Sequence, residues 1–317
     1  MISDRRGLSR RELLVGGTSL MAAALTSAIP TRLFAEELAV LDVASAGSIR
    51  PMLEGPFKTS AAQSLKLDLH THAKGADAVA QSIVDGSLRA DIFIPITPGP
   101  MLTVMRAAKA EIAQPIACTE MVLVYSPKSR FAPQFEAAAA GKANWWEILQ
   151  QPGIHFAHGN PAGDPGGRNA IFTMMLAAKK YNQPDLVKKI FGPAFDPSPT
   201  LPGSNNQERL QNGELDAATS YKIGPDWVHL PYIVLPNDIN LSGQHVHAEH
   251  PDVSLTIGGK TYFPKPLVFY AAVLKDAANR DGAVSFMRWL EGHEAQSILR
   301  RYKYDSPVDA PVLHASS

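Results

Sequence analysis

The sequence predicts an α/β protein made of two α/β units that face each other across a cleft. Short apolar segments typical of β-strands alternate with segments of helical periodicity between residues 39 and 110, an order that predicts a parallel sheet. The chain has 317 residues, which is enough for two units of about 100–200 residues each. Several predicted strands run into glycine- or serine-rich loops, and open α/β sheets bind ligands at the carboxyl ends of their strands.

The first predicted elements follow one another from residue 39 in the order strand, helix, strand, helix, strand, helix. They cover residues 39–48, 49–57 (a helix interrupted by two prolines), 64–70, 78–85, 90–95 and 101–110. Beyond these, the strongly apolar segment 121–125 predicts a strand. A helix is expected at 145–149 and a short strand at 154–157.

A loop rich in glycine and proline over residues 159–169 leads into a predicted helix that ends near residue 182. Asp164 is a good N-cap and Pro165 suits the first helical turn. Gly166 and Gly167 leave the unpaired N–H groups of this turn open to close approach, and a helix N-terminus attracts anions. Two interpretations stay open on local sequence alone: a loop that merely turns the chain, or one side of an anion site.

The rest of the chain predicts a second series of strands and a long final helix. Residues 191–206 are rich in proline, glycine, serine and asparagine and indicate an exposed loop. A helix end and a strand are expected within 210–218, and another strand at 232–235. A hairpin should join 254–257 to 260–263 through Gly258-Gly259, followed by a strand at 267–273 and one amphipathic helix over 281–301.

Composition excludes some classes of partner. The formal net charge is zero and no extended basic run follows the N-terminus, so nucleic acid is not an expected partner. Cys118 is the single cysteine, which makes a disulfide within the chain impossible. Its apolar surroundings in the sequence predict a small core residue.

The N-terminus has the pattern of an export signal. Ser9-Arg10-Arg11-Glu12-Leu13-Leu14 is a twin-arginine signature, and residues 13–29 are apolar and rich in small residues. We therefore predict a twin-arginine signal peptide over residues 1–35, cleaved near Ala35, and a periplasmic location. An uncleaved anchor is the alternative for this segment.

The order of motifs along the chain resembles that of a known family, the molybdate/tungstate-binding proteins of ABC importers, and in particular their tungstate-type branch. The segments that carry the resemblance are Ser45-Ala46-Gly47-Ser48, Ala90-Asp91-Ile92-Phe93, residues 121–126, Asp164-Pro165-Gly166-Gly167, Gly213-Glu214-Leu215-Asp216 with Tyr221-Lys222, residues 232–242 and residues 265–270. The resemblance spans almost the whole chain after the signal segment.

The resemblance implies a two-lobed periplasmic binding protein fold of type II, with two crossovers between the lobes near residues 117–121 and 217–223. The first lobe would comprise residues 36–118 and 224–317, and the second residues 119–223. The implied function is capture of a tetrahedral oxyanion, molybdate or tungstate first, for an ABC importer. Another oxyanion or small anion is the alternative ligand. The implied partners are that ligand and the transporter permease. No catalysis and no cofactor are implied, and we expect a monomer.

The resemblance, together with the strand-end loops and the chemistry of their residues, nominates ligand-binding residues. They are Gly47, Ser48, Lys74, Thr97, Asp164, Gly166, Gly167, Arg168, Asn169, Ser220 and Tyr221. Several have an alternative role: Ser48 and Asp164 as N-caps, Arg168 as a surface residue, and Tyr221 as a hinge or core residue.

Two positions depart from the family pattern. The tungstate-type branch brings two carboxylates to the metal centre; one corresponds to Asp164, but the other falls on Ser220. A glycine–serine pair is also expected near residues 73–76, where this chain has no serine. Lys74 and Arg168 would add positive charge. A tetrahedral dianion held by hydrogen bonds is therefore the simpler expectation.

A different class of function comes from the histidines. Asp68-Leu69-His70-Thr71-His72 places a His-x-His motif at a predicted strand end, as in metal-dependent hydrolases, and His245, His247 and His250 form a second group. Imidazole and carboxylate groups suit zinc. A zinc-dependent hydrolase that uses His70 and His72 is thus the alternative, although the eight β/α units of such a barrel are not in the sequence.

Overall fold

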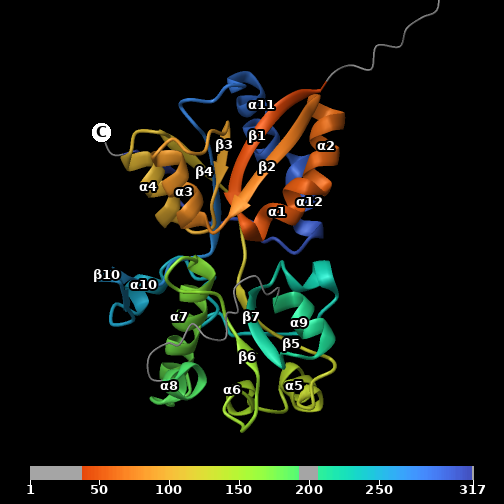
Figure 1. Cartoon of the computed structure of the whole chain (residues 1–317), viewed down its shortest axis with the longest axis vertical. Coiled ribbons are helices and arrows are strands. Elements are labelled where there is room, and N and C mark those ends of the chain that lie inside the picture. Colours follow the sequence, from red (N-terminus) through yellow and green to blue (C-terminus); the bar gives the residue numbers. More distant parts are fainter. Residues whose placement is uncertain (1–37, 193–205, 316–317) are drawn as a thin grey trace, which may run out of the picture. The chain divides into compact units, whose positions relative to one another are not determined.

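The computed structural model describes residues 38–192 and 206–315, and their strands form a six-stranded sheet, a four-stranded sheet and a hairpin (Figure 1). The six-stranded sheet has the order β12-β4-β11-β3-β1-β2. Its strands are β1 (Ala39–Ala46), β2 (Leu67–Lys74), β3 (Ile92–Ile94), β4 (Ile112–Cys118), β11 (Val268–Val273) and β12 (Leu313–His314). β1 is parallel to β2 and β3, whereas β11 is antiparallel to β3 and β4. The predicted parallel arrangement therefore holds for the first three strands.

Both faces of this sheet are covered by helices, which explains why its central strands are apolar throughout. One face carries α3 (Ala76–Val84) and α4 (Pro98–Arg106), which pack with Ala44 and Phe93. The other face carries α1 (Arg50–Glu54), α2 (Pro56–Leu65), α11 (Arg280–Glu291) and α12 (His293–Arg301). Val43 and Ile92, one residue before Ala44 and Phe93, belong to that second core, as the two-residue period of a strand requires.

The four-stranded sheet has the order β6-β7-β5-β8. Its strands are β5 (Met121–Tyr125), β6 (Phe156–Ala157), β7 (Ala217–Tyr221) and β8 (Tyr232–Val234). β5 is antiparallel to β7 and β8, and β6 is parallel to β7. The helices in this part of the chain are α5 (Ala132–Ala139), α6 (Trp145–Ile148), α7 (Pro165–Lys180), α8 (Leu186–Phe191), α9 (Asn206–Asn212) and the 3-10 turn η2 (Pro225–Val228).

The segment between β8 and β11 packs against α7. It contains α10 (Val246–Glu249) and the hairpin of β9 (Leu255–Ile257) and β10 (Lys260–Tyr262). Two lysines at the end of α7 pair with acids of this segment, Lys179 with Asp252 at 2.7 Å and Lys180 with Asp238 at 2.6 Å. These exposed pairs contribute little individually, but they show where the segment lies.

The chain passes from one sheet to the other between β4 and β5, and Glu120 lies at this passage. It is buried and is bonded on two sides: its Oε1 atom lies 3.1 Å from Lys222 Nζ, and its Oε2 atom accepts from Asn240 Nδ2 at 3.0 Å. Lys222 follows β7, and Asn240 lies on the way back toward β11. A buried carboxylate needs such partners. Glu120 therefore ties the outgoing and returning segments together.

Several predicted elements differ from the structure. The helix expected over 281–301 is two helices, because Gly292 takes an extended conformation between α11 and α12. β4 and α5 had no counterpart in the prediction. The strand expected at 64–70 begins later, because α2 continues to Leu65 and Lys66 adopts a left-handed conformation after it. Most of the loop expected over 191–206 lies outside the described residues.

The lobe boundaries remain a prediction, with one observation that differs from it. β8 falls in the range 224–317 assigned to the first lobe, yet it pairs with β5 of the four-stranded sheet. Ile233, the middle residue of β8, is buried there. The predicted signal peptide, residues 1–35, lies outside the described residues. None of the described helices is long and apolar enough to span a membrane.

Candidate functional site

A cavity of about 400 Å³ lies between loops that follow the strands of the six-stranded sheet and residues of α7 and β7. Its residues on the first side are Ala46, Gly47, Ser48, Lys74, Gly75, Ala76 and Ile96; those on the second side are Gly163, Asp164, Pro165 and Tyr221. β1 and β2 end together, since Ala46 pairs with Lys74, so the loops after them reach the cavity side by side. We call this space the solute cavity.

The two sides of the solute cavity touch at a pair of glycines. A Cβ atom on Gly75 would lie 3.0 Å from the Gly163 carbonyl oxygen, which is tighter than ordinary packing. Gly75 directly follows β2, and Gly163 precedes α7. Only a residue without a side chain permits this approach at Gly75 unless the backbone shifts. The cavity is therefore closed at this edge by backbone against backbone.

Ser48 supplies the clearest polar group of the first side. It lies in the 3-10 turn η1 (Gly47–Ile49), and its Oγ atom is buried without a hydrogen-bond partner among the described residues. Burying a hydroxyl without a partner is unfavourable, and a native structure usually satisfies it. Because Ser48 lines the solute cavity, a bound molecule is the natural partner. Gly47 is exposed beside it, and Lys74 brings an exposed ammonium group.

Asp164 opens the second side and caps α7, as predicted. Its backbone is extended, and its Oδ1 atom accepts a hydrogen bond from the Gly166 N–H at 3.0 Å. Burial raises the pKa of the Asp164 carboxyl, while the Gly166 N–H and the nearby Arg168 act in the opposite direction. Asp164 therefore combines a capping role with a place in the lining of the solute cavity.

The two glycines of α7 make contacts within the protein, and their contact with a ligand remains a prediction. The Gly166 N–H already serves Asp164. A Cβ atom on Gly167 would lie 2.2 Å from the Gly159 carbonyl oxygen, so the missing side chain makes room for the preceding loop. Neither glycine lines the solute cavity. The close approach that Gly167 permits in this structure is to the backbone of the preceding loop.

Tyr221 and Asn169 form a bonded pair across the second side. Tyr221 is the last residue of β7, and its hydroxyl accepts a hydrogen bond from Asn169 Nδ2 at 3.1 Å. Burial, and then the charge of Asp164, raises the pKa of Tyr221 above its usual value. The hydroxyl therefore keeps its proton at neutral pH and can donate it to an acceptor in the solute cavity.

Arg168 does not line the solute cavity. Its side chain is buried and forms an ion pair with Asp77 of the first turn of α3, and its Nη1 atom donates to the Pro161 carbonyl at 3.0 Å. The guanidinium carbon also lies 4.3 Å from the ring centre of Tyr262. These contacts occupy both Nη groups of the guanidinium, which the predicted ligand role would also need. Sequence reasoning missed Asp77, although an acid in the first turn of a helix after a Gly-Ala pair was a detectable signal.

A second cavity of about 210 Å³ adjoins the first and receives three of the nominated residues, Thr97, Arg168 and Asn169. Thr97 precedes α4 with φ of 68°, a region that a β-branched residue rarely adopts. Ser220 lies elsewhere, beside a small cavity near α9, because successive strand residues point to opposite faces and Tyr221 takes the other one. Its Oγ atom donates to the Tyr221 carbonyl at 3.1 Å.

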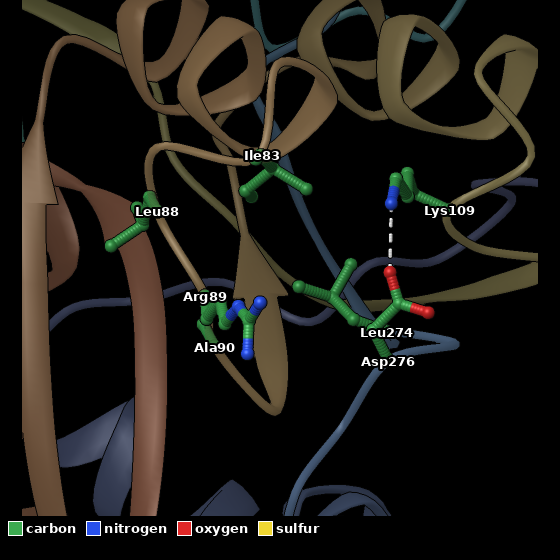
Figure 2. Close-up of a pocket in the computed structure, with 8 residues that line it drawn as sticks. Ile83, Leu88, Arg89, Ala90, Lys109, Leu274 and Asp276 are labelled. Atoms are coloured by element: carbon green, nitrogen blue, oxygen red, sulfur yellow. Dashed lines mark hydrogen bonds and ion pairs between the residues drawn. The ribbon is translucent and has the colours of Figure 1, made fainter.

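Another cavity, of about 370 Å³, lies at the opposite end of β3 (Figure 2). Ala90, just before β3, lines it, whereas Ile96, just after β3, lines the solute cavity. Lys109 and Asp276 form an ion pair at 2.7 Å across this space. It lies away from the carboxyl ends of the parallel strands, where ligands of such sheets bind.

His70 and His72 do not form the zinc site that the hydrolase alternative requires. His72 bonds Asp42 at 3.0 Å and His70 bonds Asp68 at 3.0 Å, as two separate exposed pairs on the edge of the six-stranded sheet. Within the described part of the chain, no group of three or more histidine, cysteine or acidic side chains is placed to hold a metal ion. Alternation along β2 puts His70 and His72 on one face, but each imidazole is turned to its own carboxylate.

Known proteins of several kinds share this architecture. The molybdate-binding protein of Azotobacter vinelandii superposes with a TM-score of 0.55 at 17% identity, over 84% of this chain and 99% of that one. The sulfate-binding protein SubI of Mycobacterium tuberculosis H37Rv superposes with a TM-score of 0.52 at 12% identity, over 86% of this chain and 88% of that one. The fold is therefore the two-lobed α/β fold of periplasmic binding proteins, as predicted.

The sequence comparisons are more specific. Residues 41–305 match the family model of bacterial extracellular solute-binding proteins, and the chain belongs to that family. The molybdate/tungstate-binding protein WtpA of Pyrococcus abyssi is 29% identical over 303 residues, with 85% of both chains covered. WtpA of Thermococcus kodakarensis is 27% identical over 283 residues, covering 80% of this chain and 77% of that protein. Both the family and these relatives are solute-binding proteins.

Proposed function

We propose that the protein captures a tetrahedral oxyanion, molybdate or tungstate first, and delivers it to an ABC importer. The observation that carries this proposal is the solute cavity, in which the Ser48 hydroxyl is buried without a described partner on one side and Tyr221 lines the other. The similarity to WtpA proteins named for molybdate and tungstate supports the choice of ligand. On this proposal the protein binds and releases its ligand and makes or breaks no bond.

The contacts expected in the solute cavity follow from the chemistry of its lining. An oxyanion accepts hydrogen bonds, and the Ser48 and Tyr221 hydroxyls both have a proton to give. Lys74 offers the single cation of the lining and Asp164 the single carboxylate, among the described residues. Because burial raises the pKa of Asp164, its neutral form, which would donate a hydrogen bond to the anion instead of repelling it, becomes easier to reach.

One specific observation favours a second candidate ligand. Asp164 is the one carboxylate among the described lining residues, and Ser220, where the family resemblance implies another, does not reach the cavity. If the metal centre of molybdate or tungstate takes two carboxylate ligands from the protein, the described lining of this cavity offers only one of them, Asp164. A sulfate-type anion, held by hydrogen bonds alone, is therefore the second candidate.

Export and assembly belong to the same proposal. The twin-arginine signature in residues 9–14 supports export to the periplasm in a folded state. The family of extracellular solute-binding proteins supports a location outside the cytoplasm and a permease as partner. We propose a monomer that meets its permease with the ligand enclosed.

Isothermal calorimetry and thermal denaturation with molybdate, tungstate, sulfate and phosphate test the function, with zinc as a control. A ligand present at roughly a thousand times its Kd should stabilise the protein by about 4 kcal/mol. We expect molybdate or tungstate to give the largest shift. A larger response to sulfate would establish the second candidate. No response to any oxyanion would refute the proposal, and a response to zinc in its place would favour the hydrolase alternative.

A further inference from the structure

The second cavity differs sharply in charge from the solute cavity. Its lining includes four cationic side chains and one acidic side chain: Arg106, Arg168, Lys260, Lys265 and Asp77. The solute cavity has only Lys74 and Asp164 as charged residues among its described lining, so their formal charges cancel. The positive charge near the candidate site is thus concentrated in the neighbouring space.

Most of this positive charge is uncompensated. Arg168 is neutralised by its ion pair with Asp77. Arg106, Lys260 and Lys265 make no ion pair with any residue that the structure describes; Arg106 Nε donates to the Leu102 carbonyl at 3.0 Å, and Lys260 Nζ lies 5.0 Å from the ring centre of Tyr262. They come from the end of α4, from β10 and from the segment after β10. Three separate elements therefore bring three cations to one space without a described acidic partner.

The two cavities share a wall. Pro165 lines both, and Asn169 lines the second cavity while it bonds the Tyr221 hydroxyl of the first. Asp77 lines the second cavity, and its neighbour Ala76 lines the first. The partition thus consists of the first turns of α3 and α7, and the ion pair between Asp77 and Arg168 joins them. An anion in the second cavity would lie on the other side of this partition from the solute cavity.

We propose that the second cavity is an anion-collecting vestibule, a weak second oxyanion site that feeds the solute cavity. A hollow with charges of one sign and apolar walls concentrates ions of the opposite sign and raises their association rates by about 10- to 1,000-fold. The apolar walls of the second cavity include Pro100, Phe172 and Phe263. A space of about 210 Å³ suits a small inorganic dianion. This inference rests on the proposed function, because it assumes that an oxyanion is the ligand.

The vestibule predicts an effect on the rate of binding with little effect on release. Arg106, Lys260 and Lys265 do not line the solute cavity, so they act before the ligand is enclosed. The triple variant Arg106→Gln/Lys260→Gln/Lys265→Gln should bind molybdate about tenfold more slowly at low salt, with an unchanged dissociation rate. The difference should disappear at about 1 M salt, where the Debye length falls to about 3 Å.

Stopped-flow tryptophan fluorescence with molybdate as the probe measures both rates. Trp227 of η2 stacks on Tyr302, which follows α12, with ring centres 4.6 Å apart. Its fluorescence therefore reports on the contact between η2 and the end of α12. The matched control is Lys142→Gln/Lys189→Gln/Arg301→Gln, which removes the same charge from exposed positions that line neither cavity. The single variant Lys265→Gln, which changes one exposed residue, should give part of the slowing if the triple variant is poorly folded.

The outcomes separate the two proposals. Slower association in the triple variant than in the control, lost at high salt, supports the vestibule. Equal association rates in both variants overturn it while leaving the solute site intact. An increase in the dissociation rate alone would also overturn it, because that would place the cations on the bound ligand. If the unaltered protein binds no oxyanion in calorimetry, the proposed function itself fails.

Discussion

The two sides of the solute cavity are built on different principles. On the side of the six-stranded sheet, the Ser48 hydroxyl is buried with nothing in the described structure to bond. On the side of α7, Asp164 caps the helix and Tyr221 is held by Asn169. The first side therefore has a hydroxyl that lacks a partner among the described residues, whereas Asp164 and Tyr221 on the second side each already have one. Removing a polar group from the first side should consequently weaken ligand binding alone. Removing one from the second side should weaken ligand binding and also lower the stability of the protein.

We expect the greatest change from filling the space at Gly167. In Gly167→Ala the new methyl group would lie 2.2 Å from the Gly159 carbonyl, so the second side would have to move. The free energy of unfolding should fall by about 3 kcal/mol, at the upper end of overpacking effects. Gly163→Ala is the control, because no atom of the described residues, its chain neighbours aside, lies within 4 Å of the point that its new Cβ atom would occupy. Chemical denaturation that finds both variants equally stable would mean that α7 is not pressed against the preceding loop.

Ser48→Ala removes the open hydroxyl of the first side without disturbing the protein around it. A hydrogen bond to a charged group contributes about 1.5–3 kcal/mol, so the affinity for the oxyanion should fall roughly ten- to a hundredfold. The free energy of unfolding without ligand should stay the same or rise slightly, since an unpaired hydroxyl is removed.

Ser45→Ala is the matched control for Ser48→Ala. The Ser45 Oγ atom is also buried without a partner among the described residues, but Ser45 does not line the solute cavity. Calorimetry should show an affinity loss in Ser48→Ala only. The same loss in both variants would mean that the effect spreads through β1 instead of arising at the ligand.

Tyr221→Phe, on the second side, should affect both binding and stability. It removes a donor from the cavity and leaves Asn169 Nδ2 without its acceptor. We expect the ligand-free protein to lose about 1–2 kcal/mol of stability, in addition to weaker oxyanion binding. Denaturation and calorimetry of this variant beside Ser48→Ala test the difference between the two sides directly. A Tyr221→Phe protein as stable as the unaltered one would mean that the second side is not preorganised by this bond.

A more modest effect is the pH dependence that Asp164 brings to stability. Its pKa is raised above the ordinary value of 3.8, so its contribution to stability is complete below that pH and is lost as the pH rises through the raised pKa. Asp164→Asn stays neutral and can still cap α7. Its stability relative to the unaltered protein should therefore improve from about pH 4 to about pH 7, as followed by thermal denaturation. If the stability of Asp164→Asn relative to the unaltered protein declines over this range instead, the pKa of Asp164 is lowered in the folded protein and not raised.

Much of the fold was predictable, because strand and helix periods are local properties of the chain. The order of strands through β3, the cap at Asp164 and the hairpin around Gly258-Gly259 all follow from neighbouring residues. The break between α11 and α12 was missed because both helices continue one amphipathic pattern across Gly292. The placement of β8 was missed because a strand's partner depends on contacts that are distant in sequence.

Local sequence was enough to predict two linked α/β units in an order that matches a solute-binding family, and to predict which loops reach the carboxyl ends of the strands. The use of the nominated side chains was set by contacts made in three dimensions. These contacts turned Arg168 toward Asp77, pressed Gly167 against Gly159, and left the Ser48 hydroxyl unpaired among the described residues. The physical reason is that the role of a polar group depends on which partners reach it, and a partner can come from far along the chain, as Asp77 does from 91 residues before Arg168.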